Sequence, residues 1–147
     1  VKRQIRMVVS TATSVEALLA DLMHELRLLA VAESEDVETT LLVHPQVLGD
    51  FLDYNDFLDL ADAAVEELGL DGELQVASFH PQYQFEGSEP DDISNFSNRS
   101  PYPTLHLLRE SSVERAVAAF PEAERIFEAN IETLQRLGHA GWRKLWE

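Results

Sequence analysis

Three short apolar runs at near-equal spacing constrain the fold of this chain more than any other feature. Two of them end in the same tripeptide, in LLVHPQVL and VASFHPQY, which places His44 and His80 36 residues apart. The third, MVVS at residues 7–10, ends at a similar distance upstream without the tripeptide. Such runs are typical of strands, and a proline biases the residue before it toward extended backbone. We therefore expect strands around residues 6–10, 40–44 and 74–80.

Each gap between these strands has the pattern of one amphipathic helix. TATSVEALLADLMHELRLLA opens with a capping box from Thr13 to Glu16, and FLDYNDFLDLADAAVEELGLDG stops at Gly69. Both segments repeat apolar residues at helical spacing, and the expected buried faces are Leu18, Leu22, Leu26 and Leu29 in the first and Leu52, Leu60, Ala64 and Leu68 in the second. The order βαβαβ normally implies right-handed crossovers and a parallel sheet.

The second half of the chain adds one strand and C-terminal helices. PTLHLLRE predicts a fourth strand, SSVERAVAAF a helix with a capping box from Ser111 to Glu114, and residues 121–147 a longer helix broken near Gly138 and Gly141. With 147 residues, the chain is long enough for one packed core. We expect a single α/β domain over residues 1–147, with a mostly parallel sheet of about four strands. Its start without Met suggests an N-terminal truncation.

Composition excludes several classes of protein. The chain has 27 acidic and 11 basic residues, with no Lys or Arg from residue 28 to residue 98, so it lacks the basic surface that a nucleic-acid-binding protein needs. It has no cysteine, and hence no thiolate nucleophile or disulfide. No apolar run approaches the roughly 18 residues that cross a bilayer. We expect a cytoplasmic protein that binds neither nucleic acid nor membrane.

The richest collection of reactive side chains lies in the loop of residues 81–103. In a parallel sheet, His44 and His80 would both lie at the carboxyl edge, where open α/β sheets bind ligands. The loop leaves from that edge, and its length is more typical of a functional loop than of a simple connection. We expect it to be ordered and to cover a pocket with these side chains: Gln82, Glu89, Asp91, Asp92, Asn95, Asn98 and Arg99.

Each candidate also has a structural interpretation. The two histidines could cap strand ends by bonding backbone groups, the sequence EPDD could begin a short helix DDISNF, and Arg99 could hold the loop through carbonyl groups. His106 and Arg109 belong to the fourth strand, and their odd spacing directs them to opposite faces, so at most one can share a pocket. A series of aspartates at every third position is typical of a solvated helix face: Asp50, Asp53, Asp56, Asp59 and Asp62.

Longer stretches of the chain resemble a known family. HPQYQFEGSEPDDISNFSNRSPYPTLHLLRE, LLVHPQVLGDFLDYNDFLDLAD and NIETLQRLGHAGW are similar to the domain-of-unknown-function family 1415, which occurs in bacteria and plants. The resemblance covers essentially the whole chain and implies no particular activity. It also implies an N-terminal helical segment with an Asn-Leu-Cys-Pro-Phe stretch, which this sequence does not contain. If that cysteine belongs to the site, the site here is incomplete.

Two main function classes remain, and the first is an enzyme. In it, His44 and His80 act as general acid and base or bind a divalent metal, with Asp91 or Asp92 as a further ligand or orienting group. The alternative is a module that binds a small anion through Arg99 and loop amides, with a ligand-binding set that also includes Asn98, Gln82 and His106. An interaction protein that docks a partner through Trp142 and Trp146 is a third interpretation. The oligomeric state stays open.

Overall fold

The computed structural model describes residues 5–119 together with Arg136 and Gly138. The predicted break at Gly141 and the tryptophans Trp142 and Trp146 lie outside these residues. In chain order the elements are β1 (Ile5–Val9), α1 (Val15–Val31), β2 (Thr39–Val43), α2 (Phe51–Glu67), β3 (Leu74–Phe79), a 3₁₀ helix η1 (Ile93–Asn98), β4 (Thr104–Arg109) and α3 (Glu110–Ala119). The predicted strands and the first two helices are therefore present.

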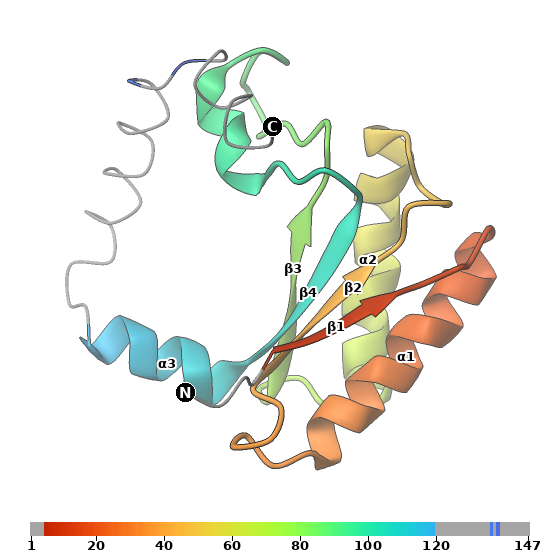
Figure 1. The fold of residues 1–147 in the computed structure, drawn as a ribbon, viewed down its shortest axis with the longest axis vertical. Helices are drawn as coiled ribbons and strands as arrows, with labels where there is room; N and C mark the ends of the chain where they lie inside the picture. Colours follow the sequence, from red (N-terminus) through yellow and green to blue (C-terminus); the bar gives the residue numbers. More distant parts are fainter. Residues whose placement is uncertain (1–4, 120–135, 137, 139–147) are drawn as a thin grey trace.

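The sheet is mixed, and the expectation of a mostly parallel sheet is wrong. Its strand order is β1-β2-β4-β3. β1 and β2 are parallel, whereas β4 is antiparallel to both of its neighbours, β2 and β3. The first three strands still run in one direction, but β2 and β3 are not neighbours because β4 lies between them (Figure 1).

The connection between β3 and β4 explains the mixed sheet. Residues 80–103 contain no helix that crosses back over the sheet; the short η1 stays within the loop. A strand that begins at the edge where the preceding strand ended must run in the opposite direction. The α2 crossover places β3 two positions from β2, and β4 fills the position between them, pairing with β2 on one side and with β3 on the other.

The described core lies on one face of the sheet, under α1 and α2 (Figure 1). The predicted leucine face of α1 is buried, with Leu18, Leu22, Leu26 and Leu29 at most 1% exposed. The predicted face of α2 is wrong in its first half, because Leu52 is 71% exposed and Leu60 44% exposed, whereas Ala64 is buried and Leu68 packs against the core. The helix instead packs through these residues: Tyr54, Phe57, Ala61, Ala64 and Val65. Aromatic residues, rather than leucines, decide which face of α2 is buried.

Helix ends show which local sequence signals were read correctly and which were not. Ser14, not Thr13, caps α1 by accepting a hydrogen bond from Ala17 N, and α3 begins at Glu110, before the predicted cap at Ser111. Asp50 caps α2, which ends before Gly69 with φ +69° in the left-handed region that favours glycine. No helix among the described residues is long and apolar enough to cross a membrane.

Candidate functional site

His44 and His80 lie at the carboxyl ends of β2 and β3 and belong to one buried cluster. Both are 0% exposed. Although β4 separates their strands, both rings contact the phenol of Tyr54 from α2, with ring centroids 5.7 Å from His44 and 4.8 Å from His80. They do not end neighbouring strands, since β4 lies between β2 and β3. The shared contact with Tyr54 nevertheless brings them together.

His80 uses both ring nitrogens on backbone groups. Its Nδ1 accepts a hydrogen bond from Gln82 N at 3.0 Å, so Nε2 carries the proton and donates it to the carbonyl of Leu48 at 2.9 Å. Burial lowers the pKa of His80, and the nearby Arg99 acts in the same direction, whereas the Leu48 carbonyl and the Asp50 carboxylate oppose it. His80 is therefore a neutral imidazole that joins the segment of residues 80–82 to Leu48.

His44 differs from His80 because one of its nitrogens has no partner. Its Nδ1 lies 3.1 Å from the carbonyl of Val47, which can only accept, so Nδ1 carries the proton. Nε2 then carries a lone pair, is buried, and has no hydrogen-bond partner among the described residues. Burial lowers the pKa of His44, the Val47 carbonyl opposes this, and repulsion from His80 lowers it further. The ring therefore stays neutral with an available acceptor.

Ser10 is a buried neighbour of His44 that sequence reasoning missed. The parallel register pairs Val9 with Val43, so Ser10 and His44 follow at adjacent positions and on the same face of the sheet. The Ser10 hydroxyl donates to Asp21 of α1 at 2.5 Å and accepts from Ala12 N at 3.1 Å. The sequence signal that could have indicated this position is the serine at the end of the apolar run MVVS.

Tyr54 was also missed, because the leucines of α2, and not its aromatic residues, were expected to form the buried face. Its hydroxyl donates to Thr104 O at 2.8 Å and accepts from Phe79 N at 3.1 Å, which ties α2 to the ends of β4 and β3. Burial raises the pKa of Tyr54, so the phenol stays protonated. It positions the two imidazoles and supplies no charge of its own.

The long loop is held down by its own polar residues. Arg99 donates through Nε to Tyr83 O at 2.9 Å and through Nη2 to Pro90 O at 2.6 Å, while its guanidinium lies 4.4 Å from the Phe96 ring centre. Asn98 donates to Ser78 O at 3.0 Å. The described polar contacts of these two residues therefore order the loop. Both lie near His80, since the His80 amide donates to Asn98 O and the charge of Arg99 acts on its pKa.

The two loop aspartates do not join the histidine pair in a metal site. Asp91, Asp92 and Gln82 are exposed, and Asp92 caps η1 by accepting from the amide and hydroxyl of Ser94, which also lower its pKa. The predicted short helix at DDISNF is thus present as η1. Within residues 5–119, Arg136 and Gly138, no three His, Cys, Asp or Glu side chains are grouped as a metal site. Nε2 of His44 is the one imidazole nitrogen of the pair that a metal could take without breaking a hydrogen bond.

His106 and Arg109 lie on opposite faces of β4, as their spacing predicted. His106 donates from Nε2 to Thr39 Oγ1 at 2.7 Å, because the hydroxyl itself donates to Leu107 O. Alternation along β4 puts it on the face away from the buried Leu105 and Leu107, hence away from His44 and His80. Arg109 donates through Nη2 to three carbonyls at the end of α1 and the following turn, those of Leu29, Ala32 and Val37.

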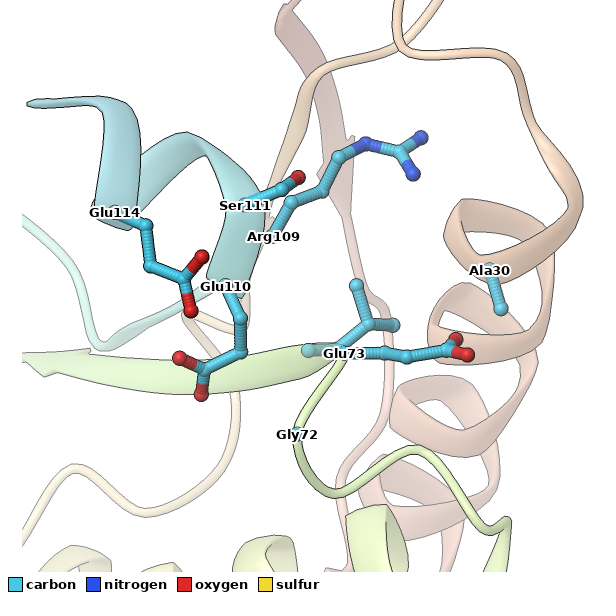
Figure 2. Close-up of a pocket in the computed structure, with 8 residues that line it drawn as sticks. Ala30, Gly72, Glu73, Arg109, Glu110, Ser111 and Glu114 are labelled. Carbon is cyan, nitrogen blue, oxygen red and sulfur yellow. The ribbon is translucent and has the colours of Figure 1, made fainter.

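A hollow of about 300 Å³ lies at the other end of the sheet, where β4 ends and β3 begins. Figure 2 shows the carboxylates of Glu73, Glu110 and Glu114 around it, while the Arg109 guanidinium points away toward α1. Arg109 is engaged by the α1 carbonyls through Nη2, whereas its Nε is buried without a hydrogen-bond partner among the described residues. The other charged side chains of the hollow are all carboxylates, while the histidine cluster combines an unpaired buried acceptor with a second imidazole on the same tyrosine, so we take the cluster as the stronger candidate site.

Comparison with known proteins assigns the chain to a family. The model of DUF1415, described as a protein of unknown function, matches residues 1–144. The chain belongs to the DUF1415 family. No curated protein and no solved structure matches this DUF1415 protein. Its function therefore has to be argued from the geometry of the site.

Proposed function

We propose that this DUF1415 protein is an enzyme that acts on a small molecule and that Nε2 of His44 accepts a proton from the substrate. The observation that carries the proposal is the buried, unpaired Nε2 lone pair, since a buried acceptor without a partner is costly unless a ligand completes it. Histidine suits this role because its ordinary pKa lies near neutral pH. The Val47 carbonyl fixes the proton on Nδ1 and so keeps Nε2 as the basic atom.

The neighbours of His44 have positioning roles in this proposal. Tyr54 stacks on the imidazole at an interplanar angle of 20°, and Ser10 with its Asp21 partner lies beside it on β1. His80 holds the segment that follows His44, because its Nε2 donates to Leu48 O. Leu48 has φ 61°, a backbone conformation that is rare for a leucine. We propose that movement of residues 45–49 admits the substrate to the buried ring.

A metal-assisted reaction would use the same atom. If a divalent metal takes part, Nε2 of His44 is its first ligand, and further ligands come from the substrate or from groups other than the His80 nitrogens. The anion-binding alternative depends on Arg99, whose Nε and Nη2 already bond loop carbonyls. The lone pair of His44 favours proton transfer over anion binding, because an acceptor nitrogen repels an anion.

The proposal is tested first by the proton position in His44. Nitrogen-detected NMR of the imidazoles should show His44 with the proton on Nδ1 and His80 with the proton on Nε2. The second test follows a mixture of small metabolites by mass spectrometry after incubation with the protein. We expect the wild type to convert at least one compound and His44→Gln to convert it at least about 100-fold more slowly, as expected for loss of a general base.

The control is the double variant Asp59→Asn with Asp62→Asn, at exposed positions of α2 that do not line the hollow beside Leu48. It should keep the wild-type rate and change the free energy of unfolding by no more than about 0.5 kcal/mol per site. Full conversion by a folded His44→Gln variant would refute the role of His44. A proton found on Nε2 of His44 would do the same.

A further inference from the structure

β1 presents an unusual edge to its surroundings. It is the outermost strand of the sheet, next to β2 only (Figure 1). Ile5, Met7 and Val9 are 58%, 66% and 60% exposed, and they lie on the face away from α1 and α2. Strand edges in soluble proteins are usually protected by charges, proline or a bulge. β1 contains no proline and no bulge. Its one charged residue, Arg6, points to the opposite face of the sheet, where its Nε lies 2.9 Å from Oε1 of Glu25.

The same three residues carry the unpaired backbone groups of this edge. The amide of Ser10 donates to Val43 O of β2. Since N–H and C=O groups of successive residues point to alternate sides of a strand, Arg6 and Val8 also bond β2, and Ile5, Met7 and Val9 turn theirs outward. Among the described residues, β1 pairs with no second strand on that side. A further strand could therefore bond at every one of these positions.

We propose that the β1 edge binds the β1 edge of a second copy of this chain, antiparallel and with a two-fold axis at Met7. This register pairs Met7 with Met7 and Ile5 with Val9, and each pair can exchange two backbone hydrogen bonds. The side chains that meet across the pairs on the exposed face are all apolar. Arg6 faces Val8 of the other copy, so no like charges are opposed.

Charge favours the β1 edge over the acidic surface of the chain as a contact between copies. The net charge is −16, and two such molecules repel each other over most of their surface. Residues 1–15 contain no Asp or Glu, so β1 and the residues that follow it bring no carboxylate of their own to this edge. Pairing here brings together two edges without opposing carboxylates. The two sheets would continue as one, with a shared apolar face.

The mass in solution tests the proposal. Light scattering of the 147-residue chain should give twice the monomer mass of 16.6 kDa at micromolar concentration. Met7→Glu puts two carboxylates at the two-fold axis and should give a monomer with an unchanged circular dichroism spectrum. Val31→Glu is the matched control, because Val31 is 81% exposed on α1 and receives the same new charge, yet should stay a dimer.

Amide exchange of the wild type decides the question even if Met7→Glu does not fold. In the proposed dimer, the amides of Ile5, Met7 and Val9 are protected at high protein concentration and exchange at least tenfold faster on dilution. A wild-type monomer at all concentrations overturns the proposal. So does a dimer in which these three amides exchange freely, since it would use another surface.

Discussion

At the scale of single residues, the two buried imidazoles make stability depend on pH. Burial lowers the pKa of both His44 and His80 below the ordinary value of 6.5. The unfolded chain takes up protons near pH 6.5 while the folded chain does not, so stability is complete above this pH and decreases as the pH falls through the lower folded values. We expect the urea midpoint to be constant between about pH 8 and 7 and to decrease toward about pH 5. His44→Gln should reduce that decrease, and an unchanged pH profile would contradict the assignment.

The hydroxyl of Tyr54 is a second single-residue feature with a measurable effect. Tyr54→Phe removes the group that bonds Thr104 O and Phe79 N and leaves both backbone groups buried without it. We expect a loss of about 1–3 kcal/mol in the free energy of unfolding, measured by urea denaturation. Tyr102→Phe is the control, because Tyr102 is 57% exposed and the same change there should cost less than about 0.5 kcal/mol. Equal effects at the two positions would show that the hydroxyl of Tyr54 is not needed.

At the scale of elements, the segment from His80 to Pro103 is ordered mainly by polar contacts rather than by regular structure. Buried Asn95 accepts from Phe85 N and Ser88 Oγ and donates to Glu89 O, and Arg99 joins Tyr83 O to Pro90 O. Arg99→Lys cannot keep both of these carbonyl bonds, because lysine lacks the planar fork. We expect faster proteolytic cleavage within residues 81–98 and a loss of about 1–3 kcal/mol.

The matched control for that prediction is Arg115→Lys. Arg115 is an exposed arginine with a 3.4 Å pair to Glu38, and such surface pairs contribute about 0–1 kcal/mol. Its cleavage pattern should match the wild type. If Arg99→Lys is as resistant to cleavage as Arg115→Lys, the carbonyl bonds of Arg99 do not order the loop.

At the scale of the whole molecule, charge is the dominant feature. A net charge of −16 on 147 residues destabilises the compact state through self-repulsion. Salt screens that repulsion, since the screening length falls from about 30 Å at 0.01 M to about 10 Å at 0.1 M. We expect the thermal midpoint at pH 7.5 to rise when sodium chloride is raised over about this range. A falling midpoint would mean that attractive ion pairs outweigh the repulsion.

The sequence by itself determined the local features of this protein. Apolar periodicity located the four strands and the buried face of α1, a glycine ended α2, and the aspartates of α2 are exposed as predicted. These features depend on residues a few positions apart, where spacing decides which side chains share a face. The two histidines were also predicted to lie together at the carboxyl ends of their strands, and both reach one buried cluster through Tyr54.

Only the tertiary structure decided which strand lies beside which and what each polar group bonds. Strand order depends on contacts between distant residues, so the insertion of β4 between β2 and β3 left no periodic signal in either strand. The same holds for the site, where the two histidines stand in identical His-Pro-Gln sequences but differ in their hydrogen bonds. The amide of Gln82 donates to the ring of His80, whereas no described donor reaches Nε2 of His44. Hydrogen bonds act over about 3 Å, a precision that spacing along a chain does not supply.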